Sequence, residues 1–289
     1  MSAISASAIA EQMLRADAQT LSAAQKLSPA DARREVQLLL RRALGVDLAG
    51  LLAHPERIPE ARTSPEYVDM LTRRLRGEPI AYIIGEREFY GLPFAVSSDV
   101  LIPRPETELL VEVALEFIAE RAECRVLDLG TGSGCVAITL AKQRRESKII
   151  ATDVSKAALA VAARNVARHS VFNVELRAGD WYKPVADLRF DIIVSNPPYI
   201  AEGDAHLEEG DLRFEPRVAL TGGATGLSAF EVIIAGARHH LRDGGSLVVE
   251  HGFDQAEQVA ALMRAHGLDE IFARTDLAGI GRITSGRCA

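Results

Sequence analysis

Residues 125–134 read Arg-Val-Leu-Asp-Leu-Gly-Thr-Gly-Ser-Gly, a short apolar strand that runs directly into a glycine-rich loop and then into a helical segment. Strand, glycine turn and helix in succession are typical of the first unit of a doubly wound α/β sheet. In such a sheet this turn binds a nucleotide-containing ligand, because glycines allow close approach and the helix N-terminus offers N–H groups. The stretch therefore predicts both the fold class and the position of a ligand site.

The segments from Glu106 onward alternate between strand and helix patterns, which predicts a parallel sheet covered by helices on both faces. The last two strands have no helix between them, so one of them is expected to be antiparallel. Strands are predicted at 124–129, 148–152, 173–177, 190–195, 245–250, 270–275 and 280–284, and helices near 106–120, 134–144, 155–168, 226–241 and 254–266.

The N-terminal residues 1–78 are predicted to form a small helical bundle. Ser28 and Ser64 each precede a proline and an acidic residue, as helix N-caps do, and Gly45 can end the first of these helices. Apolar residues then follow at helical spacing. The predicted apolar stripes are Val36, Leu39, Leu40 and Ala43 on the first helix, and Val68, Leu71 and Leu75 on the second.

Residues 79–105 differ from both neighbours, because an aromatic, extended run turns at Gly91 and is followed by a proline-rich connector. We predict a β-hairpin and linker here, with the α/β domain occupying 106–289. Arg104 and Glu106 in the connector fit two interpretations equally. They could contact a substrate, or they could fix the connector through an ion pair or a helix cap.

Composition limits the class of protein. The 289 residues are 48% hydrophobic with a net charge of −7, which favours a packed core and disfavours a large phosphate-binding surface. The three cysteines fit no zinc spacing, so we expect no metal and reduced thiols. No run approaches the roughly 18 apolar residues of a membrane span, and no signal peptide is evident. We expect a cytoplasmic monomer without stable membrane or nucleic-acid binding.

The glycine loop has the spacing G-x-G-x-G, with Cys135 where the dinucleotide fingerprint has its third glycine. Preceded by an aspartate, it resembles the S-adenosylmethionine loop of Rossmann-like methyltransferases. Asp153 ends the next strand, where an acid can accept hydrogen bonds from ribose hydroxyls, although it could instead cap the following helix. Trp181 follows a Gly-Asp turn and could cover the adenine, or it could be ordinarily buried. The predicted cofactor contacts are Gly130, Thr131, Gly132, Ser133, Gly134, Asp153, Trp181 and Asn196.

The stretch Asn196-Pro197-Pro198-Tyr199 follows the apolar strand at 190–195. Two prolines cannot continue a strand ladder, so the chain forms a stiff turn. The Asn196 side chain and the Pro197 carbonyl offer two acceptors, and Tyr199 offers a flat face. We predict that these four residues hold a planar NH₂ group for methylation, against the alternative of a purely structural turn.

Three further stretches resemble the HemK/PrmC family of peptide chain release factor glutamine methyltransferases. They are Gly77–Gly85 leading into Phe89-Tyr90-Gly91, Val100–Glu108 with its Pro-Arg-Pro-Glu-Thr-Glu run, and Asp211–Pro216 followed by Ala219–Gly223 and Gly226-Leu227. The resemblance covers nearly the whole chain. The family's close relatives that methylate a ribosomal protein share Asn-Pro-Pro-Tyr but typically carry Pro-Arg-Ser in the second stretch.

The resemblance implies a seven-stranded Rossmann-like methyltransferase domain that uses S-adenosyl-L-methionine. It also implies methylation of N5 of the glutamine in the Gly-Gly-Gln motif of class I release factors. On matching positions, Asn196, Pro197, Pro198 and Tyr199 would hold this glutamine, and Phe89 would line its pocket. We expect the N-terminal bundle to dock on the release factor.

Other functions share parts of this pattern. A nucleic-acid amino methyltransferase acting on N6 of adenine or N2 of guanine would carry the same loop and turn, but the acidic net charge disfavours it. A glutamine methyltransferase of a ribosomal protein and a scaffold without activity are the remaining alternatives. Fold alone does not separate them, because one fold hosts many chemistries.

Overall fold

The computed structural model describes residues 6–118 and 123–289, which divide into two compact units. The first unit runs to Gly85 and also includes Glu208–Phe214, and the second comprises Glu86–Leu207 and Glu215–Ala289. The chain thus leaves the second unit after Leu207 and returns to it at Glu215. This division into two units does not test the three segments predicted from the sequence. The roles of residues 1–78, 79–105 and 106–289 therefore stay predictions.

The first unit is helical, as predicted, and its helices begin and end at the expected signals. Ser28 Oγ accepts a hydrogen bond from the Asp31 N–H, Ser64 Oγ accepts one from the Tyr67 N–H, and Gly45 ends its helix in the left-handed conformation. The helices are α1 (Ala6–Gln25), α2 (Pro29–Leu44), α3 (Leu48–Ala53), α4 (Ile58–Thr63), α5 (Pro65–Leu75) and α6 (Ile80–Ile84).

The core of this unit confirms the stripe on α2 and corrects the one on α5. Val36, Leu39 and Leu40 are buried. On α5, Leu71 and Leu75 are partly buried and pack against this core as predicted, whereas Val68 is 50% exposed. The buried residues of this helix are Tyr67, Met70 and Arg74. The prediction for Val68 is wrong because the apolar stripe was assigned from aliphatic residues alone, whereas the buried residue at this turn of the helix is Tyr67. An aromatic ring buries more apolar area than valine, and its hydroxyl finds a partner here.

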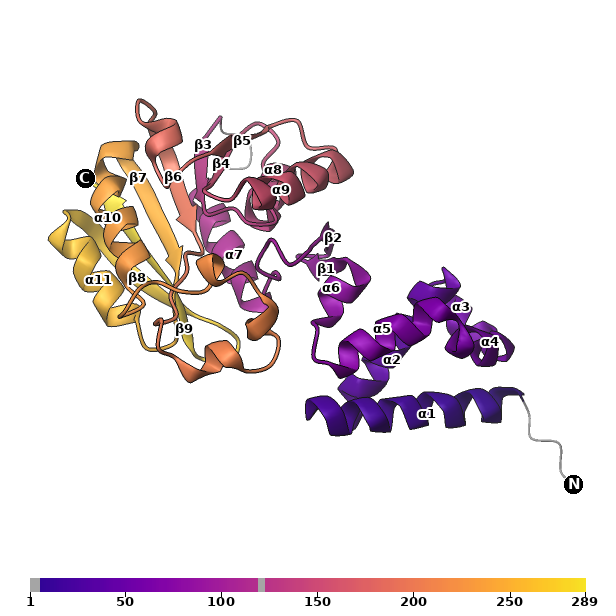
Figure 1. Ribbon diagram of the computed structural model, residues 1–289. Coiled ribbons are helices and arrows are strands. Elements are labelled where there is room, and N and C mark those ends of the chain that lie inside the picture. Colours follow the sequence, from indigo (N-terminus) through magenta and orange to yellow (C-terminus); the bar gives the residue numbers. More distant parts are fainter. Residues whose placement is uncertain (1–5, 119–122) are drawn as a thin grey trace, which may run out of the picture. The chain divides into compact units, whose positions relative to one another are not determined.

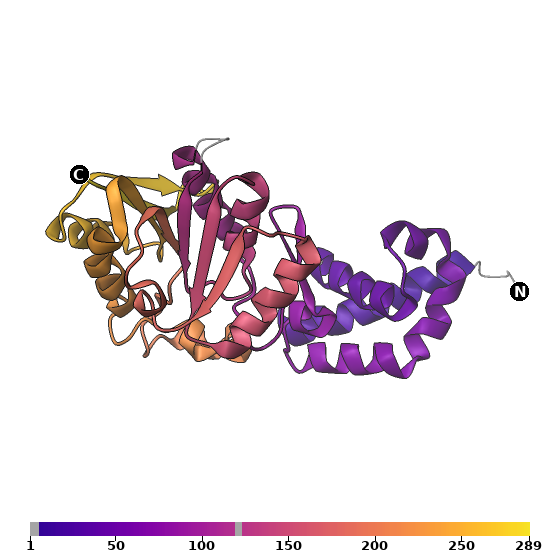
Figure 2. The same ribbon diagram turned by 90° about the horizontal axis from the view of Figure 1, so that it is seen from above.

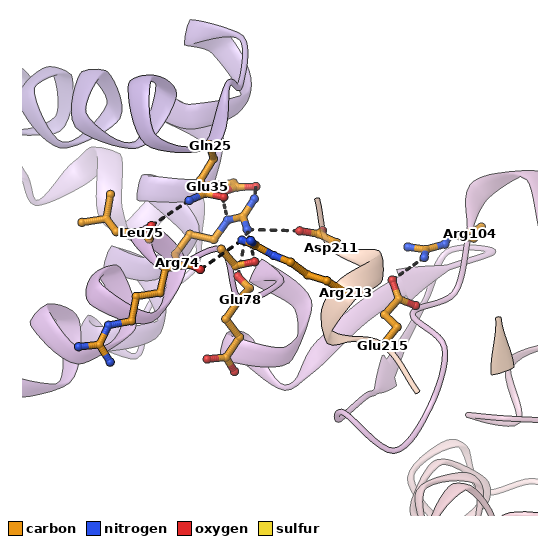
Figure 3. A network of polar contacts seen from close by, with 11 residues as sticks. Gln25, Glu35, Arg74, Leu75, Glu78, Arg104, Asp211, Arg213 and Glu215 are labelled. Atoms are coloured by element: carbon orange, nitrogen blue, oxygen red, sulfur yellow. Dashed lines mark hydrogen bonds and ion pairs between the residues drawn. The ribbon is translucent and has the colours of Figure 1, made fainter. Parts of the chain in front are cut away.

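Arg74 is the centre of a polar network in the first unit (Figure 3). Only 4% exposed, it donates hydrogen bonds to Glu35 at 2.7 Å, to the Glu78 carbonyl at 3.0 Å and to Asp211 at 3.3 Å. Because Asp211 lies in the distant segment 208–214, this buried arginine fixes that segment on the helices. Arg213 adds a hydrogen bond to the Arg76 carbonyl.

The second unit begins with the predicted hairpin and continues into a seven-stranded sheet. The hairpin pairs β1 (Glu86–Phe89) with β2 (Leu92–Ala95) around Gly91. The sheet strands are β3 (Arg125–Leu129), β4 (Lys148–Asp153), β5 (Val174–Ala178), β6 (Phe190–Ser195), β7 (Leu241–Glu250), β8 (Leu268–Thr275) and β9 (Gly281–Cys288). All seven predicted strands are present.

The strand order is β5-β4-β3-β6-β7-β9-β8. Strands β3 to β7 are parallel, and β9 is antiparallel to both β7 and β8, which confirms the predicted single reversal. In this order β4 and β5 follow β3 towards one edge of the sheet, and the chain then crosses back to form β6, the neighbour of β3 in the other direction. Ligands of open α/β sheets bind at the carboxyl ends of the strands at such a switch point.

Helices cover both faces of this sheet (Figures 1 and 2). One hydrophobic cluster joins the sheet to α7 (Glu108–Phe117), α8 (Cys135–Gln143) and α9 (Lys156–His169), and the other joins it to α10 (Ser228–His240) and α11 (Ala256–Ala265). The helix predicted at 106–120 starts with a 3₁₀ turn, Pro105–Thr107, and residues 119–120 lie outside the described residues. Within residues 6–118 and 123–289, no helix has the length and apolar character needed to cross a bilayer.

Candidate active site

A cavity of about 510 Å³ lies at the carboxyl ends of β3, β4 and β6, within the second unit. Its size is in the usual range of small-molecule sites. It brings together most of the residues predicted to bind a cofactor, from separate loops of the chain. The predicted residues that line it are Gly130, Thr131, Gly132, Ser133, Asp153, Trp181, Asn196 and Pro198.

The glycine loop turns directly after β3 and is held by the neighbouring strand. The N–H groups of Gly130 and Thr131 both donate to the Thr152 carbonyl, at 2.9 and 3.0 Å. Gly134 does not line the cavity. It has a φ of 80°, and a Cβ there would lie 3.3 Å from Ala162 on α9, so this glycine allows α8 to start close to α9.

Asn165 on α9 supports the loop from behind and was not predicted. Fully buried, it donates to the Ser133 carbonyl at 2.8 Å and exchanges hydrogen bonds with the Ala95 backbone of β2. The sequence did contain a signal for this role, an asparagine among the apolar residues of a predicted helix. A buried amide is normally hydrogen-bonded, so such a residue is expected to have partners in neighbouring segments.

Asp153 joins the glycine loop to the start of α9. Its Oδ2 accepts from the Gly132 N–H at 2.9 Å, and its Oδ1 accepts from the Ser155 N–H at 2.8 Å. Ser155, not Asp153, provides the side-chain cap of α9. Burial raises the pKa of Asp153, and the backbone hydrogen bonds oppose this effect. Each carboxylate oxygen keeps a lone pair with which it can accept a ligand hydroxyl.

Asp128 lies on the cavity wall beneath the loop, and sequence reasoning gave it no role. It is 2% exposed and accepts a 2.6 Å hydrogen bond from the Thr131 hydroxyl. Burial raises the pKa of Asp128 to about 7, and the nearby negative charge of Asp153 acts in the same direction. An aspartate in an otherwise apolar strand was the signal that could have identified it.

Trp181 and Asp180 line the cavity after β5. Trp181 is half-buried with a φ of 46°, which is an uncommon conformation for a residue other than glycine. The Thr152 hydroxyl donates to its carbonyl at 3.3 Å. The backbone is thus fixed in a strained conformation that keeps the ring at the cavity, as is frequent at ligand sites.

The Asn-Pro-Pro-Tyr turn follows β6 and reaches the same cavity. Asn196 Nδ2 donates to the Thr107 hydroxyl at 3.0 Å, so the acceptor that Asn196 can offer to a ligand is its carbonyl oxygen. Thr107 is 3% exposed and also lines the cavity, a role that was not predicted. Pro197 and Tyr199 do not line it, and burial raises the pKa of the Tyr199 hydroxyl.

A second loop, residues 220–226, packs against the back of this turn. The Ile200 N–H donates to the Leu220 carbonyl and the Gly222 N–H donates to the Ile200 carbonyl, both at 2.9 Å. A Cβ at Gly226 would collide with the Tyr199 carbonyl, which also accepts from Gln255 Nε2 at 3.1 Å. Gly222 is close to backbone in the same way, since a Cβ there would lie 2.5 Å from the Pro198 carbonyl oxygen, so close backbone contact explains both glycines.

The connector before α7 is fixed by Glu215, whose side chain is fully buried. Glu215 accepts hydrogen bonds from the Arg104 guanidinium and from the Ile102 N–H (Figure 3). This contact supports the ion-pair interpretation of Arg104, although Arg104 lines the cavity as well. Glu106 is exposed.

Phe89 lies elsewhere. It is 1% exposed, belongs to the core beside α7 and α8, and packs edge-to-face on Phe94 with 6.1 Å between ring centroids. It is not among the residues that line the cavity. The structure gives Phe89 a packing role, and its predicted contact with a substrate stays a prediction.

Comparison with known proteins identifies the family. The methyltransferase small domain matches residues 105–210, and the PrmC N-terminal domain matches residues 12–85. The release factor glutamine methyltransferase of Bordetella pertussis is 51% identical over 255 residues, covering 88% of this chain and 94% of the relative. The chain belongs to the release factor glutamine methyltransferase family. It is therefore an S-adenosyl-L-methionine-dependent methyltransferase.

Other comparisons agree with this assignment. The family member of Xylella fastidiosa strain Temecula1 is 48% identical, covering 89% of this chain and 93% of the relative. A solved methyltransferase from Pyrococcus furiosus has a TM-score of 0.54 at 20% identity, covering 76% of this chain and 98% of that chain. The latter confirms the predicted Rossmann-like fold.

Proposed function

We propose that the protein transfers a methyl group from S-adenosyl-L-methionine to N5 of the glutamine in the Gly-Gly-Gln motif of peptide chain release factors. One observation carries the proposal: the glycine loop after β3 and the Asn196 amide after β6 line a single cavity. Family membership supports the substrate class, since both relatives are named release factor glutamine methyltransferases.

The residues of the cavity fit this cofactor. When bound, S-adenosyl-L-methionine supplies a methyl group activated by a positively charged sulfur. Asp153 can accept hydrogen bonds from the ribose hydroxyls, and Trp181 can cover the adenine. The carboxylates of Asp153 and Asp180 at the cavity wall complement the positive charge of the ligand. Gly130 to Ser133 allow the nucleoside to approach the backbone closely.

Asn196 and the Pro197 backbone would orient the substrate amide. An amide nitrogen is a poor nucleophile because its lone pair is delocalised, so the site must hold its two hydrogens and direct the lone pair at the methyl group. The Asn196 carbonyl oxygen and the Pro197 carbonyl are two acceptors on a stiff turn. Holding the reactants in line lowers the barrier without a general base before transfer. The proton leaves afterwards, when methylation has made the nitrogen acidic.

The first test is methyl transfer from labelled S-adenosyl-L-methionine to purified release factor. Matched reactions contain a release factor with the motif glutamine changed to alanine, a ribosomal protein mixture, bulk RNA and bulk DNA. We expect label only on the unmodified release factor. Label on RNA or DNA would favour the nucleic-acid alternative, and label on a ribosomal protein would favour the other glutamine alternative.

Asn196→Ala tests the acceptor role. Loss of an orienting hydrogen bond in the transition state should lower kcat by roughly 10²- to 10³-fold. Cofactor affinity should change far less, because several other residues bind the nucleoside. Calorimetric titration with S-adenosyl-L-methionine and a steady-state assay give the two quantities. Equal losses in both would mean that Asn196 is mainly a cofactor contact.

The N-terminal bundle supplies the docking surface in this proposal, because a three-residue motif offers little area for specificity. Leu48 and Leu52 on α3 are 43% and 63% exposed. Leu48→Ser combined with Leu52→Ser should raise KM for full-length release factor and leave KM for a short Gly-Gly-Gln peptide unchanged. If the double variant and the wild type had equal KM values for the full-length factor, docking through this face would be contradicted. Truncation is less informative, since Arg74 also holds Asp211.

Three finer properties belong to the proposal: a monomeric state, cytoplasmic location and no stable nucleic-acid binding. The net charge of −7 supports the last. Light scattering of the purified protein, fractionation of cells and gel-shift titration with RNA at low salt would test them in turn. A dimer, a membrane-bound pool or tight RNA binding would each contradict one property.

A further inference from the structure

Glu250 is a buried carboxylate beside the active site that the proposed chemistry does not use. It is the last residue of β7, next to the end of β6, where Ser195 pairs with Val249. The next residues along the two parallel strands are Asn196 and Glu250. Glu250 is 2% exposed, and within residues 6–118 and 123–289 its Oε2 has no hydrogen-bond partner.

Several charged or titratable groups surround this carboxyl group. The pKa of Glu250 is raised to about 7, because burial and the charge of Glu106 raise it by more than Thr107, Arg282 and Arg104 lower it. Its negative charge also raises the pKa values of Tyr199 and Cys135. Among these neighbours, the Thr107 side chain interacts with Glu250 by a hydrogen bond. A buried carboxylate is costly, so its position next to Asn196 calls for an explanation.

The Thr107 hydroxyl has one hydrogen to donate and two lone pairs to accept with. In its ionised form the Glu250 carboxyl group can only accept, so the Thr107 hydrogen then points to Glu250 and the Thr107 lone pairs point elsewhere. Asn196 Nδ2 donates to this same oxygen at 3.0 Å. The hydrogen bonds therefore run in one direction, from the Asn196 amide to Thr107 and from Thr107 to Glu250.

This direction distinguishes two amide orientations that have almost the same shape. If the Asn196 amide turned over, its carbonyl oxygen would face a Thr107 oxygen whose hydrogen is already donated. Two acceptors would then oppose each other in a buried place, which is unfavourable. A neutral donor at position 250 would remove this preference, because it could donate to Thr107 and free the Thr107 hydrogen for either orientation.

We propose that Glu250 is a positioning residue that acts through Thr107 to keep the Asn196 carbonyl oxygen directed at the substrate amide. The inference rests on the proposed function, in which that oxygen accepts from the N5 group of the substrate glutamine. Glu250 does not touch the substrate in this arrangement. It sets which end of the asparagine side chain the substrate meets.

The test compares E250Q, T107V, T107S and the double variant E250Q/T107V with the wild type, and uses E257Q, an exposed glutamate on α11, as a matched control. At a pH well above the Glu250 pKa of about 7, where this group is ionised, E250Q and T107V should each lower kcat on release factor by roughly tenfold, the worth of one hydrogen bond to a charged group. Affinity for S-adenosyl-L-methionine should stay within about twofold. T107S keeps the hydroxyl and should retain most of the activity.

The double variant distinguishes positioning from general damage. If Glu250 acts only through Thr107, E250Q/T107V should be no slower than T107V alone. Multiplicative losses, wild-type kcat in E250Q, or equal losses of activity and cofactor affinity would each overturn the inference. If E250Q fails to fold, equal activities of T107V and T107S would overturn it. Absence of methyl transfer by the wild type would instead overturn the proposed function.

Discussion

Asp17 in the helical bundle and Asp128 beside the cavity are both buried carboxylates, with 6% and 2% of their surface exposed. Asp17 accepts hydrogen bonds from Arg62 Nε and Nη2 at 2.8 and 2.7 Å and from the Tyr67 hydroxyl at 2.7 Å. Asp128 has the Thr131 hydroxyl and no cation in contact among the described residues. Burial without a cation raises the pKa of Asp128 to about 7.

The difference separates residues that hold the fold from residues that serve the site. A buried charge with a bidentate partner fixes one arrangement of the helices that carry the pair. A buried carboxylate without a cation destabilises the folded state and is tolerated where a ligand uses it. Asp128 belongs to the second kind. Glu250 is likewise buried, with Arg282 and Arg104 near it, and both carboxyl groups lie towards the carboxyl ends of parallel strands.

The largest effect is expected in the bundle. Arg62→Ala leaves Asp17 buried with Tyr67 as its remaining side-chain donor, and should lower the free energy of unfolding by about 3 kcal/mol. Urea denaturation followed by circular dichroism gives this quantity. Arg34→Ala is the matched control, because Arg34 pairs with Asp31 at the surface and should cost less than about 0.5 kcal/mol. Equal costs for the two variants would remove the distinction.

The opposite sign is expected at Asp128. Its folded-state pKa of about 7 lies above the ordinary value of 3.8, so the folded state binds the proton more tightly than the unfolded state. Ionisation of Asp128 therefore lowers stability as pH rises between these values. Asp128→Asn should raise stability over the wild type, by about 2 kcal/mol more near pH 8 than near pH 5.

Thermal unfolding at the two pH values, with Thr131 unchanged, checks this prediction. Because asparagine still accepts from the Thr131 hydroxyl, the variant keeps the local hydrogen bond. If the stability difference between variant and wild type did not vary with pH, the folded state would not raise the pKa of Asp128.

A smaller effect is expected at Asp153, which is hydrogen-bonded to backbone N–H groups and also faces the cavity. Asp153→Ala should weaken S-adenosyl-L-methionine binding by roughly tenfold through loss of a charge-assisted hydrogen bond to the ribose. Calorimetric titration measures the affinity, and Asp187→Ala, outside the cavity lining, serves as a control. Unchanged affinity would contradict the ribose contact.

The sequence predicted the seven strands, the hairpin at Gly91 and the caps at Ser28 and Ser64, because these depend on local patterns. It also predicted that residues after several strands contact one cofactor, which is possible because parallel strands end at the same edge of the sheet. Contacts between distant segments were beyond it. Examples are Asp211 on Arg74 and Glu215 on Arg104, which join residues far apart in the chain.

The same limit explains what the sequence did not show about the site. Phe89 carries an aromatic ring in a distinctive stretch, and only its packing against Phe94 shows that it lies in the core. Thr107 and Glu250 look ordinary in sequence, and they gain meaning from their position beside Asn196. Asp128 was visible as an acid in a strand, but its burial required the folded structure.

The most direct test of the central claim is tandem mass spectrometry of the release factor after incubation with the protein and S-adenosyl-L-methionine. The proposed function predicts one methyl group, located on the side-chain amide of the Gly-Gly-Gln glutamine, and its loss with Asn196→Ala. A methyl group on any other residue would contradict it, and so would an unmodified factor when the protein binds S-adenosyl-L-methionine.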